Sequence, residues 1–198
     1  MDIQYNKTAM HQLGKALRVR ENALPTLQTK ESALRFEVKR ARQEVRDLEE
    51  QVRRKNAALA PTFRLWEEFP ENLVRVESIS KGVRKIAGQK VPVLDTVHFR
   101  IDPYSMVSLP SWVPAGLTAL KEISTLNIRR GLAEQKARLL EAARRKTTQK
   151  VNLYEKVQIP AFQEGIRKIK RFLEDEENLS KSSQKILKAR LAAAEAAA

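Results

Sequence analysis

Apolar residues in the first third of the chain recur in alternating steps of three and four. The series runs from Leu13 to Val52, and Arg20 and Glu31 are its two polar members. A 3.5-residue spacing kept over this length is typical of a coiled-coil seam, because an ordinary surface helix has a wider and shorter apolar stripe. We therefore predict one helix from residue 7 to about residue 58. Its apolar seam residues are Leu13, Leu17, Leu24, Leu27, Leu34, Val38, Ala41, Val45, Leu48 and Val52.

Pro25 interrupts this helix. A proline inside a helix removes one hydrogen bond and costs about 3 kcal/mol or more. The apolar register continues in phase on both sides of Pro25. We therefore expect a kink at this position and not the end of the helix.

The C-terminal part of the chain predicts a second long helix, from residue 114 to about residue 192. Pro114 suits its first turn, where a missing N–H has no helical partner to lose. From Ile159 to Leu173 the apolar residues are again spaced three and four apart. The seam drifts between Val157 and Ile159, close to Pro160, so a second local distortion is expected there.

The middle of the chain, residues 61 to 113, holds most of the helix-breaking residues. Residues 74–77 and 97–101 alternate apolar and polar side chains, which predicts a β-hairpin or a small sheet. Pro92 places its own run at a strand start or on an edge. Five aromatic residues also gather in this segment, either as a small local core or as a docking surface for a partner. They are Phe63, Trp66, Phe69, Tyr104 and Trp112.

Together these patterns predict a mainly α protein. The N- and C-terminal helices form a long antiparallel two-helix coiled coil within one chain, and a small β-hairpin-containing head joins them. The expected domains are a coiled-coil helix over 1–60, a central head over 61–113 and a second coiled-coil helix over 114–198. At 1.5 Å per residue the helices would be ~75 Å and ~115 Å long. Both termini are expected at the end opposite the head.

The charge is strongly basic. The formal net charge is +14 at pH 7, and residues 1–60 and 114–198 contribute +5 and +8 of it. Such a balance suits nucleic acid, an anionic membrane surface or an acidic protein cavity, and the charge alone does not choose among them. No apolar run reaches the roughly 18 to 20 residues that span a bilayer. Any membrane association is therefore expected to come through partners.

Residues for catalysis or metal binding do not form a recognisable set. The sequence contains no cysteine, its two histidines lie far apart, and the phosphate-binding loop motif is missing. The acidic run from Glu174 to Glu177 is consecutive, so its carboxylates should point around a helix instead of converging on a metal ion. We expect neither a catalytic site nor a cofactor.

Three segments resemble the D subunit of V-type and A-type ATPases. Residues 150–177, KVNLYEKVQIPAFQEGIRKIKRFLEDEE, are similar to the family's C-terminal signature. Lys7-Thr8 with the following leucines resembles its opening, and residues 86–93, IAGQKVPV, resemble its central hairpin element. The matching C-terminal positions are Val151, Asn152, Leu153, Ile159, Pro160, Ile166, Ile169, Leu173 and the run Glu174 to Glu177.

The resemblance implies a non-catalytic rotor shaft of a bacterial or archaeal ATPase. In this family the coiled coil enters a ring of catalytic A and regulatory B subunits, while the head binds the small F subunit of the stalk and the adaptor (the C or d subunit) of the membrane rotor. The shaft couples ATP hydrolysis or synthesis to rotation of the ion-translocating ring. The complex would place the chain at the cytoplasmic face of the cell membrane.

For the shaft tip we expect positive charges that face acidic loops of the surrounding ring. The same residues could simply form a solvated helix face. For the whole protein, the alternative is a basic coiled-coil nucleic-acid-binding or scaffold protein, whose DNA affinity would fall steeply with salt. That alternative explains the charge and the seam but not the three family-like segments, so no direct nucleic-acid partner is expected. The expected tip residues are Lys7, Lys15, Lys181, Lys185, Lys188 and Arg190.

Overall fold

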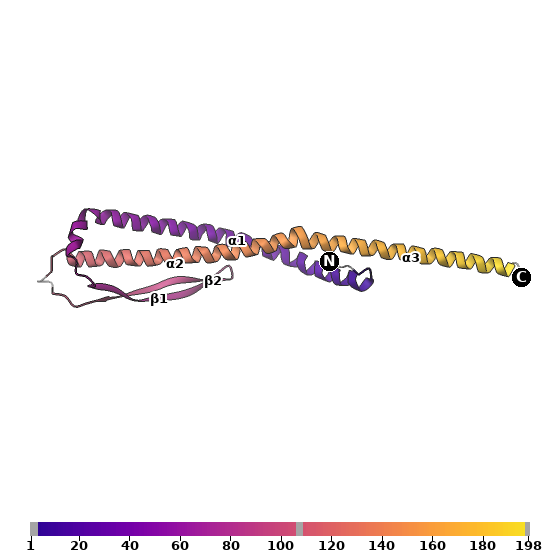
Figure 1. Ribbon diagram of the computed structural model, residues 1–198, viewed down its shortest axis with the longest axis horizontal. Coiled ribbons are helices and arrows are strands. Elements are labelled where there is room, and N and C mark those ends of the chain that lie inside the picture. Colours follow the sequence, from indigo (N-terminus) through magenta and orange to yellow (C-terminus); the bar gives the residue numbers. More distant parts are fainter. Residues whose placement is uncertain (1–3, 106–108, 197–198) are drawn as a thin grey trace. The chain divides into compact units, whose positions relative to one another are not determined.

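The computed structural model describes residues 4–105 and 109–196, with side chains up to residue 192 (Figure 1). Contacts divide the chain into two compact units. The first, here called the terminal unit, comprises Met1–Thr29 and Thr148–Ala198, and the second, the central unit, is Lys30–Thr147.

Long helices account for most of the described chain. Helix α1 spans Lys7–Leu59 and runs through Pro25, so the proline does not end it, as predicted. Its first turn is capped by Asn6, whose Oδ1 accepts a hydrogen bond of 2.7 Å from the Ala9 N–H. Two further helices, α2 over Val113–Asn152 and α3 over Ile159–Ala196, are joined by the π-helical turn η2 over Leu153–Gln158. This π turn lies where the drift of the seam predicted a distortion.

In the central unit, α1 and α2 pair in antiparallel fashion. Glu44 accepts a hydrogen bond from Lys136 at 2.8 Å, and Glu122 accepts one from Lys55 at 2.6 Å. As residue numbers rise along α1, those of the partners fall. The predicted antiparallel helix pair is therefore confirmed.

The core of the central unit draws on three segments that lie far apart in the sequence. Leu34, Val38 and Ala41 of α1 pack with Leu140 of α2 and with Val91 of the hairpin. Leu34 and Leu140 are completely buried. These α1 residues belong to the predicted seam, so the 3.5-residue pattern identified the buried face correctly.

Two strands, β1 over Val74–Ile86 and β2 over Gln89–Ile101, form the predicted hairpin. Both strands are longer than the alternating runs that predicted them. Most of the residues added to β1 are polar or charged and exposed, so no alternation of apolar and polar side chains marked them as part of a strand. Ala87 and Gly88 between the strands have positive φ angles of 47° and 83°, as a two-residue type I′ turn requires. Pro92 pairs opposite Val83 in this sheet of two edge strands.

A second cluster in the central unit holds most of the aromatic residues. Trp66, in the 3₁₀ helix η1 over Ala60–Glu68, has its ring 5.3 Å from Phe69 and 5.3 Å from Trp112. The rings of Phe69 and Trp112 pack against the cluster that contains the buried Val113 at the start of α2. The interpretation as a small local core therefore fits these residues, whereas Phe63 is 62% exposed and lies outside it.

Candidate functional site

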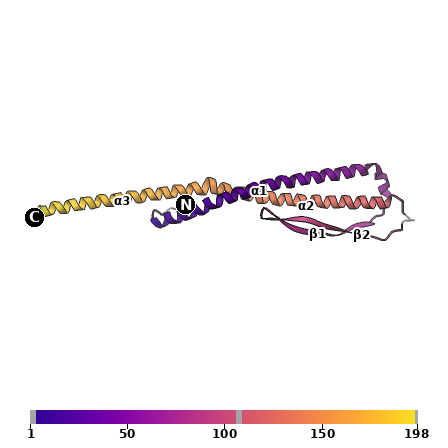
Figure 2. The same cartoon turned by 180° about the vertical axis from the view of Figure 1, so that it is seen from behind.

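The free end of α3 is the most distinctive surface of the terminal unit. The ring of Tyr5, just before α1, lies 5.1 Å from that of Phe172 on α3. Beyond this contact α3 continues past the start of α1 (Figure 2). Every side chain described from Glu174 to residue 192 is exposed. We call residues 178–192, the part of α3 that follows Glu177, the single-helix end.

Three of the expected tip residues lie on the first turns of α1 or at the start of the single-helix end. Lys7 is the first residue of α1, and Lys181 Nζ lies 2.6 Å from Glu177 Oε1. The hydrogen bond from Lys181, the Lys181 charge and the charge of Lys7 all lower the pKa of Glu177. The structure thus pairs Lys181 with this carboxylate and places Lys7 near enough for its charge to act on it. Lys15 is exposed two turns further along α1.

The remaining expected residues lie on the single-helix end itself. Lys185, Lys188 and Arg190 are all exposed. Lys181, Lys185 and Lys188 are spaced by four and three, so at 3.6 residues per turn they share one face of α3. Arg190 falls on a different side of the helix by the same rule.

Sequence reasoning missed an apolar row on the single-helix end. Leu179 is 70% exposed, and Ile186 follows it seven residues later at 57%. This spacing puts both on the face opposite the three lysines. Leu187 and Leu191 are also exposed, four residues apart. Extending the seam analysis beyond Leu173 could have found this row.

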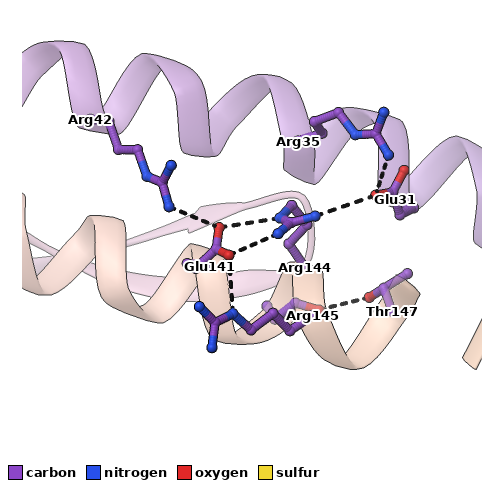
Figure 3. A network of polar contacts seen from close by, with 8 residues as sticks. Glu31, Arg35, Arg42, Glu141, Arg144, Arg145 and Thr147 are labelled. Carbon is purple, nitrogen blue, oxygen red and sulfur yellow. Dashed lines mark hydrogen bonds and ion pairs between the residues drawn. The ribbon is translucent and has the colours of Figure 1, made fainter. Parts of the chain in front are cut away.

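A network of charged residues crosses the seam of the central unit (Figure 3). Glu31, the polar seam residue, is buried and lies 3.0 Å from Arg35 on its own helix and 3.9 Å from Arg144 on α2. Arg144 also reaches Glu141 at 2.8 Å, and Arg42 of α1 lies 3.6 Å from the same carboxylate. The network therefore joins α1 to α2 at two carboxylates.

Glu141 carries the largest pKa change in this network. The hydrogen bond from Arg144 is the main cause, and one from Arg145 and the charge of Arg42 add to it, so the pKa falls from 4.5 to about 2. The same hydrogen bond raises the pKa of Arg144. Both groups therefore stay charged at neutral pH. Polar residues in a seam fix pairing register, because a shifted pairing would bury them without partners.

The second polar seam residue, Arg20, makes the corresponding contact in the terminal unit. Its Nε donates a hydrogen bond of 2.6 Å to Gln158 Oε1. Its guanidinium lies 4.7 Å from the ring centre of Phe162 and 5.8 Å from that of Tyr154. The sequence identified Arg20 and Glu31 as seam members but not their partners.

Among the described side chains, which end at residue 192, no three His, Asp or Glu residues are grouped so that they could hold a metal ion. Within residues 4–105 and 109–196, no helix combines the length and the apolarity needed to cross a bilayer.

Comparison with known proteins agrees with this architecture. The chain is 28% identical to the V-type ATP synthase D subunit of Borreliella burgdorferi over 193 residues, which is 96% of this chain and 95% of that protein. It is 33% identical to the Chlamydia muridarum protein of the same name and 34% identical to that of Chlamydia trachomatis, each over 157 residues and 77% of both chains. The family model for the ATP synthase D subunit matches residues 9–189. The chain therefore belongs to the family of ATP synthase D subunits.

Proposed function

We propose that this chain is the non-catalytic central rotor shaft of a V-type or A-type ATPase. It couples ATP hydrolysis or synthesis in the catalytic ring to rotation of the ion-translocating ring in the membrane. Family membership supports a place in such a complex. The chain would then be peripheral, at the cytoplasmic face of the membrane, and held there by its partners.

The observation that carries this proposal is the single-helix end of α3. An exposed helix that continues past its partner suits insertion into a cavity, whereas a self-contained coiled coil would pair its apolar residues to the end. Antiparallel packing in both units resists sliding of one helix along the other, which a shaft that transmits torque requires. The A and B subunits of the ring are the proposed surroundings of this end.

The two faces of the single-helix end have different proposed roles. Lys181, Lys185 and Lys188 face acidic loops of the ring, and their attraction varies with the angle of rotation. Leu179 and Ile186, on the opposite face, contact an apolar collar. Charge acts over about 8 to 10 Å at physiological salt, so it guides the shaft without the close fit that would block rotation. The F subunit of the stalk and the adaptor of the membrane rotor (the C or d subunit) are the proposed partners of the central unit.

The test is neutralisation of the expected tip in the reconstituted complex. Lys7, Lys15, Lys181, Lys185, Lys188 and Arg190 are all changed to Gln. We expect assembly to persist while ATPase activity loses its coupling to rotation. The control changes six exposed cations on the paired part of the terminal unit to Gln: Arg18, Lys156, Arg167, Lys168, Lys170 and Arg171.

Two outcomes would contradict the proposal. Unchanged torque and coupling in the tip variant would remove the role of these cations, and an equal loss in both variants would show that only total charge matters. The shaft assignment itself is tested by affinity purification from the native host with mass spectrometry. Recovery of the ring subunits and the F subunit supports it, and their absence from an intact preparation contradicts it.

A further inference from the structure

The buried residues of the C-terminal helices do not follow one uninterrupted heptad series. Ala133 and Leu140 are buried and seven residues apart, and so are Phe162 and Ile169. Leu140 and Phe162, however, are separated by three heptads plus one residue. The partly buried Tyr154 continues the first series, so the extra residue lies between Tyr154 and Phe162.

The π turn η2 occupies this interval. Its hydrogen bonds span five residues instead of four, as from the Ile159 N–H to the Tyr154 carbonyl. A single π turn therefore takes up one additional residue without rotating the helix that follows. Pro160 comes directly after it and has no N–H to donate. In a regular α-helix its ring would also clash with the Lys156 carbonyl, a conflict that the wider turn relieves.

Arg20 contacts the C-terminal half of the chain at two residues within this turn and at one residue after it. It reaches Tyr154, Gln158 and Phe162, which are four residues apart in each step. In a regular α-helix eight residues displace the third contact by about 80° around the helix axis, and a turn with more residues reduces this offset. Its NH1 also donates to the carbonyl of Ala16 at 3.0 Å, which anchors the guanidinium on α1.

We propose that Leu153–Gln158 is a skip segment, a one-residue insertion in the heptad series, and that Arg20 is the positioning residue that holds it closed against α1. The seam does not need the insertion, since removing one residue would restore a continuous heptad series. The skip segment is instead the part of this helix that opens most readily, because Pro160 removes one of the backbone hydrogen bonds that would close it. This inference concerns the chain itself and does not depend on the rotary role.

Matched deletions of two exposed lysines test the skip. In a Pro160→Ala background, one variant lacks Lys156, inside the skip segment, and the other lacks Lys168, between the buried Phe162 and Ile169. We expect the first deletion to keep or raise the Tm of the P160A chain. The second should lower it by roughly 5 °C or more, because it breaks a heptad that has no extra residue to lose. Equal losses, or a larger loss on deleting Lys156, would overturn the proposal.

Hydrogen exchange of the full-length chain tests the role of Arg20. Arg20→Met keeps an unbranched apolar stem but removes the guanidinium, and Arg18→Met is the control on the exposed side of α1. We expect R20M, but not R18M, to speed exchange at residues 155–159 by about ten-fold. In the Pro160→Ala chain that lacks Lys156, R20M should have no such effect, because no wide turn remains for Arg20 to hold. Acceleration of the same size in both backgrounds, or none in either, would contradict the proposal.

Discussion

The guanidinium of Arg144 lies 3.9 Å from the carboxylate of Glu31 across the seam of the central unit, and their side chains are only 27% and 11% exposed. A charge that loses its partner in such a shielded place is costly, whereas replacement of both charges by apolar groups is often neutral or stabilising.

Glu31→Leu and Arg144→Leu should each lower the free energy of unfolding by about 1–3 kcal/mol. The double variant should lose clearly less than the sum, because each single change leaves a shielded charge with one partner fewer, whereas the double change removes both charges. Urea unfolding of the four chains measures both quantities. Glu50→Leu, which removes a half-exposed partner of Arg53 and Arg54, is the control and should change the free energy of unfolding much less. Additive losses for Glu31 and Arg144 would show that the pair is not coupled.

Acid should weaken the central unit through Glu141. Its pKa is about 2 in the folded chain, below the ordinary value of 4.5. A carboxyl whose pKa is depressed on folding stabilises the fold above its unfolded pKa, and this stability is lost as the pH falls from about 4.5 towards 2. We expect Glu141→Gln to remove about 1–3 kcal/mol of this pH dependence, measured by urea unfolding between pH 7 and pH 2.5.

On acidification, the E141Q chain should lose less of its free energy of unfolding than the unmodified chain, but the loss should not be zero. Folding also lowers the pKa values of Glu50 and Glu177, so these carboxylates respond to acid in the same direction. An unfolding profile of E141Q that is parallel to that of the unmodified chain would contradict the role of Glu141.

Two glycines of α2 should respond oppositely to alanine. A Cβ on Gly116 would lie 2.8 Å from the ring of Trp112, whereas at Gly131 nothing lies within 4 Å. Alanine favours a helix over glycine by about 1 kcal/mol, so Gly131→Ala should raise the Tm. Gly116→Ala should lower stability by about 1–3 kcal/mol, because the aromatic cluster must shift. Thermal unfolding followed by circular dichroism compares the two variants. A higher Tm in both would show that the aromatic cluster accommodates the added methyl group without loss of stability.

The apolar row of the single-helix end should matter little to the isolated chain. Changing Leu179, Ile186, Leu187 and Leu191 to Ala removes exposed side chains, so the free energy of unfolding should move by about 0.5 kcal/mol or less per site. Phe162→Ala, which removes a buried side chain, is the control and should cost about 3–5 kcal/mol. A comparable loss from the exposed set would show that the row is packed within the chain.

The seam was predictable because its periodicity is local and long. The series through Leu34, Val38 and Ala41 marks the buried face of α1, and the drift near Pro160 marks the π turn. Partner choice was not predictable in the same way. Arg20 and Glu31 interrupt an apolar series, but which residues of the second helix meet them depends on a pairing register that no local pattern encodes.

The hairpin and the single-helix end were harder to predict for different physical reasons. Beyond Glu77, strand β1 is mostly exposed, so no alternation of apolar and polar residues marks its length. Its turn uses Ala87 at a positive φ where Asn or Gly is the usual signal. In the single-helix end, the apolar row has helical spacing but no partner, so sequence alone does not separate it from a seam. The three-part division of the chain into domains stays a prediction.

The meeting of Leu34, Val91 and Leu140 in one core also sets the order of events while the chain is being made. Roughly a hundred residues separate the first of these side chains from the last, and ribosomes add about 5–20 residues per second. A newly emerged α1 must therefore wait roughly 5–20 s with its apolar stripe uncovered. Nascent chains arrested before and after Leu140 should differ sharply in their need for chaperone protection.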